Sequence, residues 1–159
     1  MDRSMPRKFF EQHVRPSYEE WLRDPANERL AKIAAQAAND MAAHVLHYWQ
    51  GLDRSKVYGA KKEGAYRDEL ASRECADFAL VRDVAEAHKH VKLERRSRLI
   101  TGYDQTAVKD TVYEEGVFEE GVFEGEVLVT LDDGTSRPLA EIMGNVIAMW
   151  TRLLERMVL

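Results

Sequence analysis

The chain has 159 residues, of which 45% are apolar and 32% are charged. This length and composition predict one helical domain over residues 1–159. No uncharged stretch is long enough to cross a bilayer, and no apolar segment follows the basic residues near the start, so we expect no membrane span, no secretory signal and a cytoplasmic protein. The single cysteine, Cys75, excludes an intrachain disulfide and a thiolate-rich zinc site.

Charge is distributed unevenly along the chain. Residues 1–100 hold 19 basic and 16 acidic residues, a net charge of +3, whereas residues 101–159 hold 4 basic and 12 acidic ones, a net charge of −8. The two parts should attract each other. A chain with a net charge of −5 is a poor non-specific ligand for nucleic acid, but a local basic strip would still attract phosphate.

The start of the chain predicts two short helices. The first should run from Pro6 to about His13 and end at Arg15-Pro16. A capping box, Ser17-Tyr18-Glu19-Glu20, should begin the second helix over residues 18–23. Helices this short are marginal unless they pack on a neighbour, so we expect both to lie against the next element.

A long helix should follow. Asp24-Pro25 supplies an N-cap carboxylate and a proline at the first helical position, and Gly51 is a suitable terminator, so the helix should end at Gln50. Its inward stripe should contain residues that recur at steps of three and four: Leu30, Ile33, Ala34, Ala37, Met41, His44, Val45 and Tyr48.

A second long helix should run from about Ala65 to Leu99. A polar loop over residues 53–64 precedes it, and Thr101-Gly102 should end it. Two long helices joined by so short a loop predict an antiparallel pair. The inward side of the second helix should carry Leu70, Phe78, Val81, Val84, Ala85, His88 and Val91.

The pattern then changes to that of a small β-meander over residues 106–137. Glu126–Leu131 is rich in β-formers, and the Asp-Gly turn in Asp132–Thr135 should reverse the chain. Between these strands a five-residue near-repeat, Val-(Tyr/Phe)-Glu-Glu-Gly, covers residues 112–125. We interpret it as a local duplication in an exposed hairpin tip, with a partner-binding loop as the alternative.

Pro138 should begin the last helix, from Leu139 to about Met157. Its apolar residues cover more than one stripe, so it should be buried centrally or also face a partner subunit, and we expect a homodimer through it. The sequence therefore predicts a mainly α fold: an antiparallel helical bundle with a small antiparallel β-meander inserted before the C-terminal helix.

The densest group of charged and titratable residues lies over residues 82–93. On a helix, Asp83, Glu86 and His90 fall within about 60° of one another. Two carboxylates and an imidazole on one face could hold a metal or carry out acid-base chemistry. The alternative is a solvated face with Glu86 and His90 as an i,i+4 pair.

A metal site in a helical bundle needs ligands from facing helices. The candidate set combines His44 or His47 with Glu86 or His90. Antiparallel packing could also bring His44 toward His88. As the alternative, both histidines are hydrogen-bonded members of the core.

A basic strip follows on the C-terminal part of the second long helix, with Glu94 as the opposing charge. Cations near a helix C-terminus are favoured by the helix dipole, which gives a structural reason for the strip. The functional interpretation is binding of phosphate, including that of RNA, or of the acidic meander. The strip comprises Lys89, His90, Lys92, Arg95, Arg96 and Arg98.

Arg82 is followed by the polar Asp83 and then, after four more residues, by His88. This pattern resembles the arginine-to-histidine motif of the HEPN superfamily, small all-helical proteins that include metal-independent ribonucleases. The resemblance implies that Arg82 would hold the scissile phosphate and that His88 would act in acid-base transfer, with Asp83 as the polar residue of the motif. These residue types suit that chemistry.

A second segment, D-x-A-x(3)-K-H-x(2)-L, is similar to one in small uncharacterised bacterial proteins and implies no known activity. It is formed here by Asp83, Ala85, Lys89, His90 and Leu93. We therefore carry three hypotheses. The first is a non-catalytic interaction or regulatory module with a protein partner and no cofactor, the second a HEPN-like ribonuclease, and the third a metal-binding bundle.

Overall fold

A computed structural model describes residues 5–95, 97–108 and 125–157, and it confirms the mainly α fold with a small antiparallel sheet before the C-terminal helix. Most of the five-residue near-repeat lies outside the described residues. In chain order the elements are α1 (Met5–Phe9), the π-helical turn η1 (Phe10–Val14), α2 (Arg15–Leu22), α3 (Glu28–Trp49), the 3-10 turn η2 (Arg54–Val57), α4 (Glu63–Arg73), α5 (Phe78–His90), the 3-10 turn η3 (Tyr103–Gln105), β1 (Thr106–Val108), β2 (Val127–Thr130), β3 (Ser136–Pro138) and α6 (Leu139–Met157).

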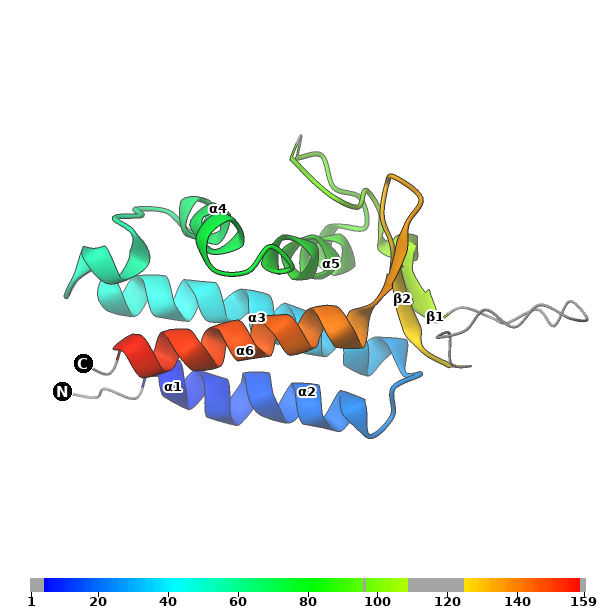
Figure 1. Ribbon diagram of the computed structural model, residues 1–159, viewed down its shortest axis with the longest axis horizontal. Helices are drawn as coiled ribbons and strands as arrows, with labels where there is room; N and C mark the ends of the chain where they lie inside the picture. Colours follow the sequence, from blue (N-terminus) through cyan, green and yellow to red (C-terminus); the bar gives the residue numbers. More distant parts are fainter. Residues whose placement is uncertain (1–4, 96, 109–124, 158–159) are drawn as a thin grey trace, which may run out of the picture.

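The helices are arranged around α3 and α6. Figure 1 shows these two helices running through the middle of the molecule, with α1 and α2 along one side and α4 and α5 along the other. The three strands pack at one end of the bundle, and α1 and the last turn of α6 lie at the other. One contiguous apolar core includes residues of α2, α3, α4, α5, α6 and β2.

The first two predicted helices are in fact one continuous helical segment, so the expected break at Arg15-Pro16 is wrong. Pro16 lies near the start of α2 and has no N–H to donate to the preceding turn. The wider turn of η1 comes directly before it and accommodates the carbonyl groups that a proline ring crowds. The Ser17–Glu20 capping box is not used, because α2 has no side-chain cap.

The long helix α3 begins three residues later than Asp24-Pro25 predicts. Its N-cap is Asn27, whose Oδ1 accepts from the Leu30 N–H at 3.1 Å. Asp24 instead accepts from the Asn27 side chain at 3.0 Å. The predicted stripe is largely buried, but Ile33 and His44 are exposed.

The prediction of a second long helix from about Ala65 to Leu99 is wrong in two places. The chain breaks over residues 74–77, where the Leu70 carbonyl accepts from the backbone N–H of both Glu74 and Cys75 at 3.0 Å. The helix resumes as α5 and ends at His90. Neither break contains glycine or proline, so the residue types gave no stop signal.

The strands pair in the order β1-β2-β3, all antiparallel. The predicted turn between β2 and β3 is confirmed, with the Gly134 N–H donating to the Leu131 carbonyl at 2.9 Å and φ of +90° at the glycine. The Val108 N–H donates to a Glu28 carboxylate at 2.7 Å, which joins the sheet to the start of α3.

The predicted bounds of α6 are also confirmed. Its two apolar stripes are buried inside the same chain, and the buried Trp150 Nε1 donates to the Ala38 carbonyl of α3 at 3.0 Å. The excess of apolar residues is therefore explained without a partner subunit.

Asp77, at the α4–α5 break, joins α5 to the start of α6. It accepts two hydrogen bonds from Arg137, at 2.6 and 2.9 Å, and one from Asn145 at 2.8 Å. The hydrogen bonds from Arg137 lower the pKa of the Asp77 carboxyl. A lowered folded-state pKa contributes stability above the unfolded value of about 4 that is lost as pH falls through the folded value.

We expect Asp77→Asn to lower the free energy of unfolding by about 1–2 kcal/mol at pH 7. The deficit should shrink as pH falls below about 4 and through the lowered pKa of Asp77, because the wild-type carboxyl then becomes protonated. Urea unfolding at a series of pH values measures both. Glu141→Gln, which removes the more exposed partner of Arg137, is the matched control. A deficit that does not change with pH contradicts the assignment.

Candidate functional site

The chain turns back on itself directly after α5. The Lys92 N–H donates to the His90 carbonyl at 2.7 Å, which closes a γ-turn centred on Val91. Val91 has φ of +68° and ψ of −47°, a conformation that is strained for a β-branched residue. We call the segment that follows the basic loop, residues 91–102.

The two ends of the basic loop pair with each other. Lys92 and Gly102 form an isolated antiparallel bridge, and the Leu93 N–H donates to the Thr101 carbonyl at 2.7 Å. Leu93 and Ile100 are buried in the core. The loop is thus held at both ends, and between them Glu94, Ser97, Arg98 and Leu99 are exposed.

Arg95 fastens the middle of the loop to α5. Its guanidinium donates to the carboxylates of Asp83 and Glu86, and its Nε donates to the Ser97 carbonyl at 3.1 Å. Asp83 is 1% exposed and also accepts from the Leu99 N–H at 2.7 Å. Burial raises the pKa of the Asp83 carboxyl, while the Leu99 N–H and the Arg95 charge oppose that rise.

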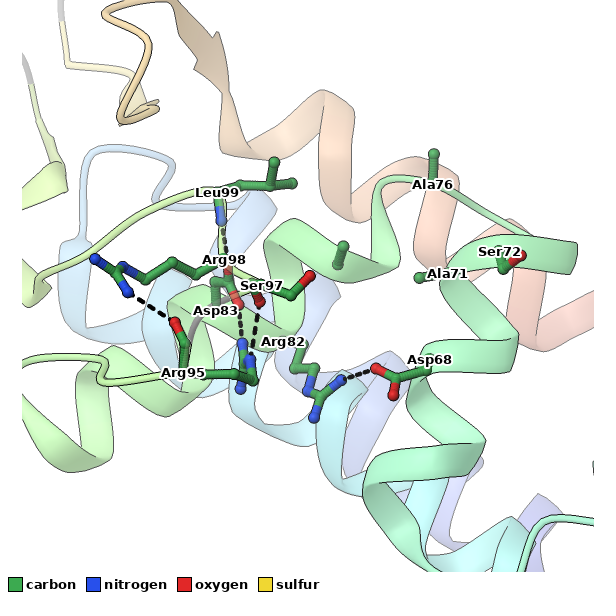
Figure 2. A pocket seen from close by; sticks show the side chains of 11 residues that line it. Asp68, Ala71, Ser72, Ala76, Arg82, Asp83, Arg95, Ser97, Arg98 and Leu99 are labelled. Carbon is green, nitrogen blue, oxygen red and sulfur yellow. Dashed lines mark hydrogen bonds and ion pairs between the residues drawn. The ribbon is translucent and has the colours of Figure 1, made fainter.

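Arg82 extends this arrangement toward α4. It donates to Asp68 at 2.7 Å and to Glu86 at 3.2 Å. Opposite charges therefore alternate from Asp68 through Arg82, Glu86 and Arg95 to Asp83, and Figure 2 shows the pairs from Asp68 to Arg82 and from Arg95 to Asp83. Sequence reasoning missed Asp68, because the break between α4 and α5 sets its distance from Arg82.

Two hollows flank Arg95. The first, of about 470 Å³, lies between α4, α5 and the basic loop, and Figure 2 shows Ala71, Ser72 and Ala76 on its α4 side. The second, of about 380 Å³, lies at the end of α5. The first is lined by Asp68, Ala71, Ser72, Ala76, Ala79, Arg82, Asp83, Arg95, Ser97, Arg98 and Leu99, and the second by Glu86, His90, Lys92, Leu93, Glu94 and Arg95.

The structure divides the predicted basic strip into inward and outward residues. Arg95 faces inward and forms ion pairs with Asp83 and Glu86. Arg98 donates to the Arg95 carbonyl at 2.7 Å, with its Nε 3.9 Å from Asp132. Arg96 lies outside the described residues.

The other described residues of the strip face solvent together with two apolar side chains. Lys89, His90 and Lys92 are exposed and make no ion pair within the part of the chain that the structure describes. Val91 is 67% exposed and Leu99 is 39% exposed. We define the basic face as Lys89, His90, Val91, Lys92, Arg98 and Leu99.

Arg82 lines the first of the two hollows that flank Arg95, whereas His88 lines neither of them. The His88 ring packs 6.0 Å from the Tyr103 ring, and its buried Nδ1 has no hydrogen-bond partner among the described residues. Lys32, 2% exposed, places its Nζ 3.3 Å over the same Tyr103 ring. A step of six residues separates Arg82 from His88 by about 120° on a helix, which accounts for this separation.

The histidines of α3 are also separate from those of α5. His44 stacks on Phe9 at 3.7 Å and His47 bonds to Glu63 at 2.9 Å, and both line a hollow of about 440 Å³ that neither Glu86 nor His90 borders. Burial lowers the pKa of His44. Within the described residues, no three His, Cys, Asp or Glu side chains are arranged to hold a metal ion.

No family model, curated protein or solved structure matches the chain. Among the helices that the structure describes, none combines the length and the apolar character that crossing a membrane requires.

Removing the Arg95 guanidinium would leave the buried Asp83 carboxylate without its counter-charge, although the Leu99 N–H would still donate to it. We expect Arg95→Gln to lower the free energy of unfolding by about 2–3 kcal/mol, because a buried carboxylate without its counter-charge is costly. Adding Asp83→Asn should recover at least about 1 kcal/mol, since the buried charge is then gone.

Urea unfolding of the two single variants and the double variant measures this coupling. Arg73→Gln, which removes the exposed pair with Glu69, is the matched control and should cost less than about 0.5 kcal/mol. Additive single effects would show that Arg95 does not neutralise Asp83.

Proposed function

We propose that the protein is a non-catalytic interaction module that binds an acidic segment of a partner protein on the basic face. The observation that carries the proposal is the pairing pattern of the cations. Arg82 and Arg95 are neutralised by carboxylates, whereas Lys89 and Lys92 are exposed and unpaired within the described residues. Such cations are available to a ligand without breaking an internal ion pair.

The size and charge of the protein favour a short acidic segment over a long polyanion. The chain carries a net charge of −5, so a long nucleic acid that extends beyond the basic face would be repelled by the rest of the molecule. A segment of a few residues stays close to the face, within about one Debye length of 8 Å at physiological salt.

The apolar residues of the face favour a protein segment as well. Val91 and Leu99 are exposed and lie next to Lys92 and Arg98 in the chain. Burying their apolar surface would favour binding of a ligand that carries apolar side chains between its carboxylates. The hollows on either side of Arg95 provide room for such side chains.

The pairing of Arg82, Asp83 and Arg95 with neighbouring charges supports a structural role for these residues. The nuclease hypothesis on Arg82 and His88 stays a prediction, as do the metal site, the homodimer through α6 and the cytoplasmic location. None of them has an observation in its favour comparable to the unpaired cations.

The binding proposal is tested with a fluorescein-labelled peptide that alternates glutamate and leucine, followed by fluorescence anisotropy at about 50 mM salt. We expect the double variant Lys89→Gln/Lys92→Gln to weaken binding by about 10-fold, because two exposed charge pairs of about 0.5–1 kcal/mol each are lost. Lys61→Gln/Lys62→Gln removes the same charge from exposed lysines before α4 and should change binding less than 2-fold.

Equal weakening by the two double variants would show that only net charge matters and would contradict a defined face. Tighter binding of an oligouridylate RNA that carries the same charge would favour nucleic acid instead. Unchanged binding by both double variants would exclude the basic face as the binding surface.

The nuclease hypothesis is tested separately by incubating mixed RNA with the protein in excess chelator. Our proposal predicts no cleavage by the wild type. Cleavage that persists in chelator and disappears in both Arg82→Ala and His88→Ala, each shown to be folded by circular dichroism, would establish the nuclease and contradict a non-catalytic module.

A further inference from the structure

The net negative charge of the chain is contributed by one segment. Residues 109–124 contain six acidic residues and one basic residue, a net charge of −5, and the other residues hold 22 of each sign. The segment also contains the repeated unit Val-(Tyr/Phe)-Glu-Glu-Gly, which places an aromatic residue beside two glutamates. We call residues 109–124 the acidic repeat.

The acidic repeat has the composition that the basic face fits. Its paired glutamates complement Lys89 and Lys92, and its aromatic residues supply apolar surface for Val91 and Leu99. A partner protein would need the same combination of carboxylates and apolar side chains at a spacing of a few residues.

We propose that the basic face of one copy binds the acidic repeat of a second copy, so that the protein associates with itself by reciprocal exchange. This proposal rests on the proposed function and names the chain itself as a partner. Two copies related by a two-fold axis make the contact twice, once in each direction. The second contact forms within the complex at a high effective concentration, which compensates for the weakness of a single exposed contact.

The charge character of this interaction predicts a steep dependence on salt. Exposed ion pairs contribute roughly 0.2–1 kcal/mol each and are screened as ionic strength rises. A dimer formed through α6 would instead bury apolar surface and would persist at high salt. The two modes of association can therefore be distinguished by salt alone.

The experiment measures molar mass by sedimentation velocity over a range of protein concentrations, in 50 mM and 500 mM sodium chloride. The wild type should form a dimer at low salt and a monomer at high salt. The face variant is Lys89→Gln/Lys92→Gln, and the control is Lys61→Gln/Lys62→Gln. The repeat variant replaces its five glutamates by glutamine at Glu114, Glu115, Glu119, Glu120 and Glu124.

The face variant and the repeat variant should each raise the dimer dissociation constant at least 10-fold, whereas the control should match the wild type. The decisive measurement is made on a mixture of the face variant and the repeat variant. The face variant keeps an intact acidic repeat and the repeat variant keeps an intact basic face, so the mixture should form a one-to-one complex more tightly than either variant associates alone. Structural damage to either variant cannot produce this complementation.

A wild type that stays monomeric at low salt up to about 1 mM would overturn the proposal. So would a dimer that persists at high salt or in both variants. If the glutamate-leucine peptide still binds in a Lys89- and Lys92-dependent manner, only the self-association is wrong and the interaction module stands. If neither binding nor association depends on these lysines, both proposals fail.

Discussion

The structure at the end of α5 depends on one buried ion pair. Asp83 lies on the inward side of α5, where a carboxylate is costly unless every lone pair is satisfied and a counter-charge is close. Arg95 and the Leu99 N–H meet that requirement, and both come from the basic loop. If the loop left α5, the buried Asp83 carboxylate would lose its counter-charge. The position of the loop therefore determines the two hollows and which cations face outward.

The strained turn at Val91 follows from this constraint. A helix that continued past His90 would carry Arg95 away from Asp83, because five further residues would place it about 7.5 Å farther along the axis. The chain instead reverses within one residue and accepts a positive φ at a valine. The paired loop ends and the burial of Leu93 and Ile100 stabilise a conformation that the local sequence disfavours.

The sequence predicted those parts of the fold that have local signals. Pro138 and the apolar pattern located α6, and the turn with Gly134 located the β2–β3 hairpin. The end of α5 had no such signal, since a glycine or proline stop is absent and the strongest reason for the break is the distant pairing of Asp83 with Arg95. Tertiary ion pairs of this kind are invisible to periodicity.

The same limit applies to the site. Residue types alone identified the basic strip, but the helix-dipole explanation does not hold for Lys92, Arg95 and Arg98, which lie beyond the last turn of α5. Which cations face inward depends on the reversal at Val91. Arg82 and His88, in turn, lie about 120° apart on α5, so their spacing in the sequence does not by itself place them in one site.

The most direct test of the central claim is hydrogen exchange of the wild-type protein with and without the glutamate-leucine peptide. We predict slower exchange of backbone amides over residues 89–99, with no change over residues 54–62, the segment before α4 that carries the control lysines. Protection confined to another surface, or no protection at peptide concentrations that saturate the anisotropy signal, would contradict the basic face as the binding surface.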